Sequence, residues 1–183
     1  MWSQTSLAGK RVLVTAGGDG IGLEIARAFA GAGSKILVCD IQPESLARLA
    51  KDLPDVHSCL ADVSREKDVA SRFELVDQKL GGLDVLVNNA GIAGPTGGVE
   101  TLSLADWERT LAVNLTGQFL CIRQAVPRLR QGCDPSIINL ASAAGHLGMP
   151  GSRRPHKNDH AGNRGVRDRF GVLEIPHFRR RVR

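Results

Sequence analysis

The sequence of 183 residues contains no tyrosine, and aromatic residues make up only 4% of it. No phenol is therefore available to act as an acid or a base. Long apolar runs are also missing. None approaches the ~20 residues that a membrane helix requires, so we expect no membrane partner. The first ten residues lack the apolar core of a secretory signal, and the expected location is cytoplasmic.

Cysteine is sparse and dispersed along the chain. The four cysteines form no Cys-x-x-Cys pair, and they are Cys39, Cys59, Cys121 and Cys133. This spacing favours buried free thiols over disulfides or metal ligands. The sequence therefore predicts no metal site.

The net charge of +5 is distributed unevenly. Residues 152–183 carry nine arginines and one lysine against three acids, a net charge of +7, whereas residues 1–151 carry −2. The basic surplus belongs to the end of the chain and is not a nucleic-acid signal for the rest. We expect no nucleic-acid partner.

Short apolar runs and helical patterns alternate from the start of the chain. Helical spacing is expected from residue 21, and over 43–53, 66–80 and 105–130, the last as one helix or as two with a bend. Residues 92–102 are predicted to form a loop. Strands are expected at 11–15, 35–40, 56–60, 83–87 and 136–140. This order predicts an α/β fold, a Rossmann-type doubly wound parallel sheet.

The alternating pattern stops at Gly151. Residues 152–183 show no apolar periodicity, and such a composition buries too little surface to offset the ordering entropy of the chain. We therefore predict one Rossmann-type domain over residues 1–151 and a basic, disordered tail over residues 152–183.

A glycine-rich turn follows the first strand and opens a helix. Small residues let a backbone approach a pyrophosphate, and a helix N-terminus supplies free N–H groups and a positive dipole. A tight strand-to-helix turn without a ligand also needs glycine, so this alternative stays open. The candidate cofactor residues of the turn are Thr15, Gly17, Asp19, Gly20, Ile21 and Gly22.

Asp40 ends the second predicted strand. A carboxylate at this place can accept hydrogen bonds from the ribose hydroxyls of adenosine and would repel a 2′-phosphate. No arginine stands near Asp40 in the sequence to bind that phosphate. The prediction is NAD rather than NADP, with a solvated loop aspartate as the alternative.

Four further motifs stand in order after the glycine turn. They are Asp62-Val63 after the third strand, Asn88-Asn89-Ala90-Gly91 after the fourth, Asn114 in the long helix, and Ser142 after the fifth strand. Together with the turn they resemble the short-chain dehydrogenase/reductase family over residues 7–151. The resemblance implies an NAD-dependent oxidoreductase that transfers hydride between nicotinamide and a secondary alcohol or ketone. Members of the family are usually homo-oligomers.

The resemblance also implies roles for single residues. Asp62 and Val63 would lie beside the adenine, and Asn89, Ala90 and Gly91 would line the cofactor side of the fourth strand. Asn114 would hold a helix bend and an ordered water, and Ser142 would hydrogen-bond the substrate oxygen. The purely structural alternatives are a strand-end cap for Asn88, a mid-helix kink for Asn114 and a strand-end turn for Ser142.

Two departures from the family pattern are evident. Ala16 replaces the first glycine of the turn, which requires a negative φ at this residue or a re-formed turn. The Tyr-x-x-x-Lys positions are occupied by Pro155 and Asp159. Proline cannot carry a proton, and an aspartate brings negative charge where a lysine cation is required. The adjacent pair His156 and Lys157 cannot take over, because a helix would point them about 100° apart.

After about Gly151 the alternating apolar pattern stops and an arginine-rich segment follows. A reading-frame shift or an altered splice is the most economical explanation of this change in composition. The C-terminal strands and helices of the family would then be missing, and the fifth strand would form a bare edge. We expect this chain to be inactive. The alternatives are a non-catalytic NAD-binding or partner-binding module, and a fragment without function.

Overall fold

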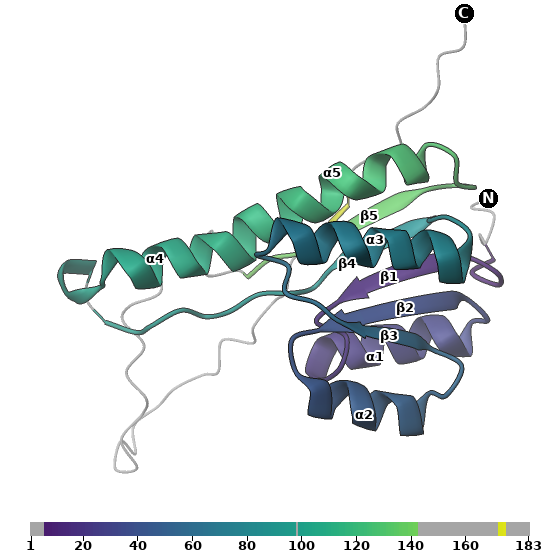
Figure 1. The fold of residues 1–183 in the computed structure, drawn as a ribbon, viewed down its shortest axis with the longest axis horizontal. Helices are drawn as coiled ribbons and strands as arrows, with labels where there is room; N and C mark the ends of the chain where they lie inside the picture. Colours follow the sequence, from purple (N-terminus) through teal and green to yellow (C-terminus); the bar gives the residue numbers. More distant parts are fainter. Residues whose placement is uncertain (1–5, 98, 143–171, 175–183) are drawn as a thin grey trace, which may run out of the picture.

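The computed structural model describes residues 6–97, 99–142 and the backbone of 172–174. Its centre is one sheet in the order β3-β2-β1-β4-β5-β6, in which the first five strands are parallel (Figure 1). These strands are β1 (Arg11–Thr15), β2 (Lys35–Asp40), β3 (His57–Leu60), β4 (Val85–Asn88) and β5 (Ser136–Leu140). The predicted Rossmann-type fold is confirmed.

Helices cover both faces of the sheet. On one face, α1 (Gly20–Gly31) and α2 (Pro43–Asp52) pack on Val12, Val14 and Val38. On the other face, α3 (Glu66–Leu80) and α5 (Gly117–Leu129) pack on Leu13 and Leu37 (Figure 1). Because successive side chains of a strand point to opposite faces, each central strand must be apolar throughout.

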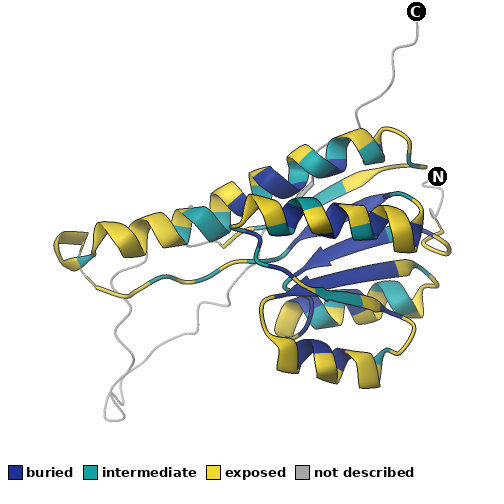
Figure 2. Cartoon of the chain, in the orientation of Figure 1, coloured by how far each residue is buried: buried dark blue, intermediate teal, exposed yellow. Residues whose placement is uncertain are grey.

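The predicted helix over 105–130 is an α-helix interrupted by a π-turn. It consists of α4 (Leu104–Leu111), η2 (Ala112–Thr116) and α5, and a 3-10 turn, η1 (Val99–Thr101), precedes it. Figure 2 shows that α4 projects beyond the sheet with most of its surface exposed. Among the described residues, no helix combines the length and the apolar character that crossing a bilayer requires.

We expected the fifth strand to form a bare edge, and this prediction is wrong. β6 (Val172–Glu174) pairs with β5 in antiparallel register, with Leu140 opposite Val172 and Ile138 opposite Glu174. The unpaired N–H and C=O groups of an edge strand are a template for any extended segment. The rest of the predicted disordered tail, and the predicted break at Gly151, lie outside the described residues.

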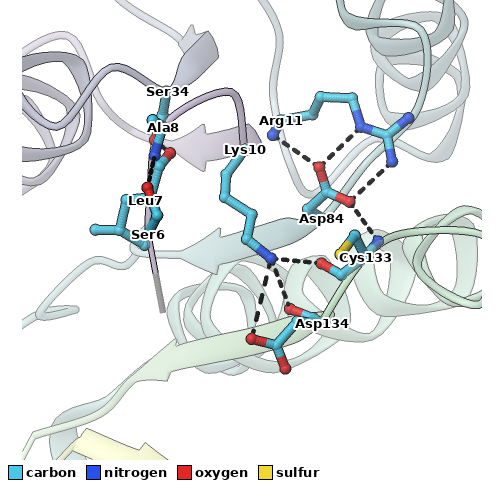
Figure 3. Close-up of polar contacts among 9 residues, drawn as sticks. All are labelled: Ser6, Leu7, Ala8, Lys10, Arg11, Ser34, Asp84, Cys133 and Asp134. Carbon is cyan, nitrogen blue, oxygen red and sulfur yellow. Dashed lines mark hydrogen bonds and ion pairs between the residues drawn. The ribbon is translucent and has the colours of Figure 1, made fainter. Parts of the chain in front are cut away.

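A polar network ties the amino ends of three strands together (Figure 3). The buried Asp84 carboxylate accepts from Arg11 Nε and Nη2, each at 2.8 Å, and from Arg11 N at 2.9 Å. It also accepts from Cys133 N at 2.9 Å, just before β5. Lys10 Nζ donates to the Cys133 and Asp134 carbonyls. These contacts lie at the sheet edge opposite to the one where ligands bind in this fold class.

All four cysteines are free thiols. Cys39 and Cys121 are buried as predicted, and their Sγ atoms each lie 3.1 Å from the guanidinium of the buried Arg72. Burial raises the pKa of the half-buried Cys59 thiol to about 12. The prediction of burial is wrong for Cys133, which is exposed because it lies in the turn before β5.

Candidate cofactor site

The carboxyl ends of β1 and β4 meet where the strand order reverses. This is the place where open α/β sheets bind ligands. Thr15 Oγ1 accepts hydrogen bonds from the backbone N–H groups of Asn89 and Ala90, both at 3.0 Å. Asn89 Nδ2 donates to the carbonyls of Thr15 and Ala16, at 3.1 and 2.9 Å. The buried Thr15 thus holds the carboxyl ends of β1 and β4 together.

Gly22, in the first turn of α1, brings the helix into contact with the turn. A side chain there would place its Cβ 2.1 Å from the Ala16 carbonyl oxygen and 2.5 Å from Asn89 Nδ2. Only glycine leaves room for this approach. Gly17, earlier in the turn, is fixed to β2 because its N–H donates to the Cys39 carbonyl at 3.2 Å.

The N-terminus of α1 is open at the same edge. Asp19 is the N-cap, and its Oδ1 accepts from Gly20 N at 2.7 Å. The N–H groups of the first turn have no intrahelical partner and carry the positive end of the helix dipole. Ile21 extends from this turn with 51% of its surface exposed. The turn can therefore hold an anionic group against its backbone.

Of the two alternatives that we gave for Ala16, a negative φ or a re-formed turn, the negative φ is wrong. The φ of Ala16 is +49°, in the left-handed region that glycine prefers. The Asn89 bond to the Ala16 carbonyl and the Gly17 bond to β2 hold the turn in this conformation. Ala16 therefore takes a conformation that glycine would adopt more easily.

An Ala16→Gly substitution should stabilise the chain. The left-handed conformation costs an L-residue about 1–2 kcal/mol, and part of this gain is offset by the greater freedom of glycine in the unfolded chain. We expect the free energy of unfolding to rise by about 1 kcal/mol, measured by urea denaturation. Ala47→Gly, on the exposed face of α2, is the matched control and should lower the free energy of unfolding by about 1 kcal/mol. Unchanged or lower stability of Ala16→Gly would contradict strain at this residue.

Asp40 lies at the end of β2 beside the glycine turn. Its Oδ2 accepts from Gly18 N and its Oδ1 from Gln42 N, both at 3.0 Å. The side chain is nearly buried. A carboxylate has about four lone-pair positions, so each oxygen can accept a further hydrogen bond. Asp40 is thus held in place with acceptor capacity left over, unlike the solvated loop aspartate of the alternative.

One arginine does reach the neighbourhood of Asp40, contrary to our expectation. Arg48 Nη2 donates to Asp19 Oδ2 at 2.8 Å and to Ser45 Oγ at 3.1 Å. Ser45 Cβ and Asp40 Oδ2 both lie within 3.0 Å of the position that a Gly18 Cβ would take. Arg48 belongs to α2 and lies three residues after Ser45, so both side chains are on one face of the helix. This spacing is the one feature of the sequence that could have placed the Arg48 side chain beside Ser45.

Asp62 and Val63 follow β3. Burial raises the pKa of Asp62, but hydrogen bonds from Ser64 Oγ at 2.7 Å and Ser64 N at 2.9 Å outweigh it, so the pKa lies below its usual value. Val63 is buried in the core and packs against Gly117 of α5. Asp62, with Ile41, lines a cavity of about 620 Å³ that extends along α3.

Asn114 clamps the loop after β4. Its Oδ1 accepts from Ile92 N and its Nδ2 donates to Ile92 O, both at 2.8 Å. Asn114 belongs to the π-turn η2, and Gly91 lies directly beside it. The side chain therefore positions the loop at the carboxyl edge of the sheet.

Asn88 and Ser142 complete the sequence-predicted set. Asn88 Nδ2 donates to Asn139 Oδ1 at 2.8 Å and so links the ends of β4 and β5. Ser142 follows β5 at the same edge of the sheet and is exposed. Pro155 and Asp159 lie outside the described residues. Within residues 6–97 and 99–142, no group of three or more metal-ligating side chains could hold a metal ion.

Comparison with known proteins supplies an independent finding. A family model for short chain dehydrogenase matches residues 10–153. L-fucose dehydrogenase of Bos taurus is 36% identical over 145 residues, which cover 79% of this chain and 53% of the relative. For 2-(S)-hydroxypropyl-CoM dehydrogenase 3 of Xanthobacter autotrophicus the identity is 36% over 143 residues, covering 76% and 56%.

A solved structure is similar as well. A short-chain dehydrogenase from Novosphingobium aromaticivorans superposes with a TM-score of 0.73 at 27% sequence identity. The match covers 79% of this chain and 56% of that protein. The chain thus spans about half the length of the curated relatives it matches.

Proposed function

The chain belongs to the short-chain dehydrogenase family, and on that premise we propose that it binds NAD(H) at the carboxyl edge of its sheet without transferring hydride. Members of this family depend on NAD(P). When bound, the nicotinamide of such a cofactor accepts or donates a hydride. The observation that carries the proposal is the Asp40 carboxylate, which two backbone N–H groups hold beside the glycine turn.

The residues present fit a dinucleotide. The close approach at Gly22 exposes backbone rather than side chain, and the first turn of α1 offers N–H groups to a pyrophosphate. Asp40 would accept from the ribose hydroxyls, and Asp62 from the adenine amino group. Asn89, Ala90 and Gly91 would line the nicotinamide side. Thr15 and Asn114 would hold these segments in place.

Asp40 also supports NAD in preference to NADP. Its carboxylate is almost removed from solvent, where repulsion between like charges is poorly screened. A 2′-phosphate beside it would add charge of the same sign. The nearby guanidinium of Arg48 does not offset this repulsion, because it is paired with Asp19.

Inactivity follows from the residues at the proton-transfer positions. A secondary alcohol or ketone, the substrate class that the family resemblance implies, exchanges a proton at its oxygen during hydride transfer. Ser142 can donate a hydrogen bond to that oxygen, but Pro155 and Asp159 supply neither a phenol nor the cation that lowers its pKa. We therefore assign cofactor binding, and not turnover, to this chain.

Titration of the full chain with NADH, followed by nucleotide fluorescence, tests the proposal. We expect saturable binding, together with no oxidation of NADH when a panel of ketones is added. Absence of any fluorescence change at millimolar nucleotide would remove the binding function. Robust ketone reduction would show that another residue moves the proton and would overturn the assigned inactivity.

An Asp40→Asn variant should bind NADH at least tenfold more weakly, since a charge-assisted hydrogen bond contributes roughly 1.5–3 kcal/mol. The same fluorescence titration measures the loss. Asp55→Asn is the matched control, because Asp55 lies on the exposed turn before β3, away from the site. Equal affinities of Asp40→Asn and the unaltered chain would place the ribose elsewhere.

A second candidate function, pairing with another copy of the chain, is favoured by α4 and the start of α5. One stripe of large apolar side chains is exposed there, formed by Leu104, Trp107, Leu111, Leu115 and Phe119. In a two-fold pair these helices would run antiparallel. Antiparallel packing would lay the apolar stripe of one copy along the same stripe of the other. This self-complementarity favours a second copy as the occupant.

A Leu115→Glu substitution should abolish this pairing. A charge in the middle of an apolar interface is desolvated without a partner, so the elution volume should shift from dimer to monomer. Size-exclusion chromatography with light scattering measures the mass. Ala47→Glu, on the exposed face of α2, is the control that should leave the mass unchanged. A monomeric unaltered chain would remove this candidate.

A further inference from the structure

The geometry points to Asp19 as a second specificity-determining residue. We propose that Asp19, by pairing with Arg48, withholds a guanidinium that would otherwise bind the 2′-phosphate of NADP(H). This inference rests on the proposed cofactor site. It goes beyond that site because it assigns cofactor choice to an ion pair between α1 and α2, in addition to Asp40.

Three contacts place Arg48 next to the expected ribose position. Its Nη2 lies 3.1 Å from Ser45 Oγ. Ser45 is buried against Gly18, and Gly18 N donates to the Asp40 carboxylate at 3.0 Å. Two residues, Ser45 and Gly18, therefore link the guanidinium to the carboxylate that would bind the ribose. A phosphate on the 2′ oxygen would lie within the same group of side chains.

Asp19 determines where the guanidinium points. Its Oδ2 accepts from Arg48 Nη2 at 2.8 Å, while its Oδ1 stays on the first N–H of α1. The carboxylate is thus shared between the helix cap and the arginine. Its negative charge sits at the helix end that would hold the pyrophosphate, and Arg48 neutralises it there.

The ion pair between Asp19 and Arg48 can be broken without disturbing the fold. Both side chains are largely exposed, 60% for Arg48 and 70% for Asp19. Exposed ion pairs contribute little to stability, so the fold does not depend on this one. A guanidinium presents several N–H groups in one plane and binds phosphate through two of them at once. Once released, Arg48 would be a suitable phosphate ligand.

An Asp19→Asn variant tests the inference, because asparagine also caps helices and preserves the fold. NADH and NADPH are titrated separately with the full chain, and nucleotide fluorescence gives the two dissociation constants. Removal of the carboxylate relieves repulsion of the pyrophosphate equally for both nucleotides. The ratio of the constants therefore isolates the 2′-phosphate. We expect this ratio to move up to about fivefold in favour of NADPH, because an exposed ion pair withholds the guanidinium only weakly.

The double variant Asp19→Asn with Arg48→Gln completes the cycle. Without the guanidinium the ratio should return to that of the unaltered chain, and Asp55→Asn should leave it unchanged throughout. An unaltered ratio in Asp19→Asn, or a shift that persists in the double variant, would overturn the inference while NADH binding still supports the proposed function. Failure of every variant to bind either nucleotide would overturn both.

Discussion

An Asp84→Ala variant is expected to lose about 3 kcal/mol of unfolding free energy, the lower end of the range for breaking a buried ion pair, because the Arg11 side chain is 24% exposed. Asp84 is 4% exposed and accepts from Arg11 and from the Cys133 backbone (Figure 3). Its loss would leave the Arg11 guanidinium with only its bond to the Gly81 carbonyl. Urea denaturation at neutral pH measures the change. Asp55→Ala is the control, and a similar midpoint for both variants would contradict this role.

The same carboxylate makes stability depend on pH. Hydrogen bonds from Arg11 hold the pKa of Asp84 well below its usual range. Because the folded-state pKa is lowered, the stabilisation is fully present above the unfolded-state value of about 3.9 and is lost as pH falls below it. The unaltered chain should therefore weaken between about pH 4 and pH 2 more steeply than Asp84→Ala. Parallel acid-unfolding curves by circular dichroism would contradict the linkage.

A Gly22→Ala variant should lose NADH binding altogether. Its Cβ would lie 2.1 Å from a backbone oxygen, so either α1 or the turn must move. Such overpacking typically costs 1–3 kcal/mol, and it displaces the N–H groups that would face the pyrophosphate. Fluorescence titration and urea denaturation measure the two effects separately.

Gly31→Ala is the matched control for this substitution. It adds the same methyl group to the same helix in open space, and alanine favours helix. We expect unchanged binding and equal or slightly higher stability. Normal NADH affinity in Gly22→Ala would show that the close approach of α1 to the turn is not needed by the cofactor.

The fold could be predicted from the sequence because its signals are local. Apolar runs such as Arg11–Thr15 mark buried strands, and the helical spacing of Val69, Phe73 and Val76 marks α3. The alternation of the two then limits the topology to few arrangements. The positions of Asp40 and Asn89 at strand ends followed from the same reasoning, since parallel strands end at one edge.

The features that the sequence did not predict depend on contacts between elements that are distant in the sequence. Arg48 lies far from Asp19 in sequence, and only the packing of α2 beside α1 brings them together. The left-handed φ of Ala16 is imposed by bonds from Asn89 and from β2, and not by alanine itself. The pairing of β6 with β5 joins segments that no local pattern connects.

The π-turn at η2 makes the helix sensitive to the loss of one residue. A π-turn holds one residue more than an α-helical turn needs, and here that extra residue lets Asn114 hold Ile92 through two hydrogen bonds. Deleting Leu115 or Thr116 would restore a regular α-helix but rotate Asn114 by about 100° relative to α5. The helix would become regular, but the loop after β4 would lose the two hydrogen bonds between Asn114 and Ile92. Chains that carry such a deletion should be well folded, but the loop after β4 should be mobile at the carboxyl edge of the sheet.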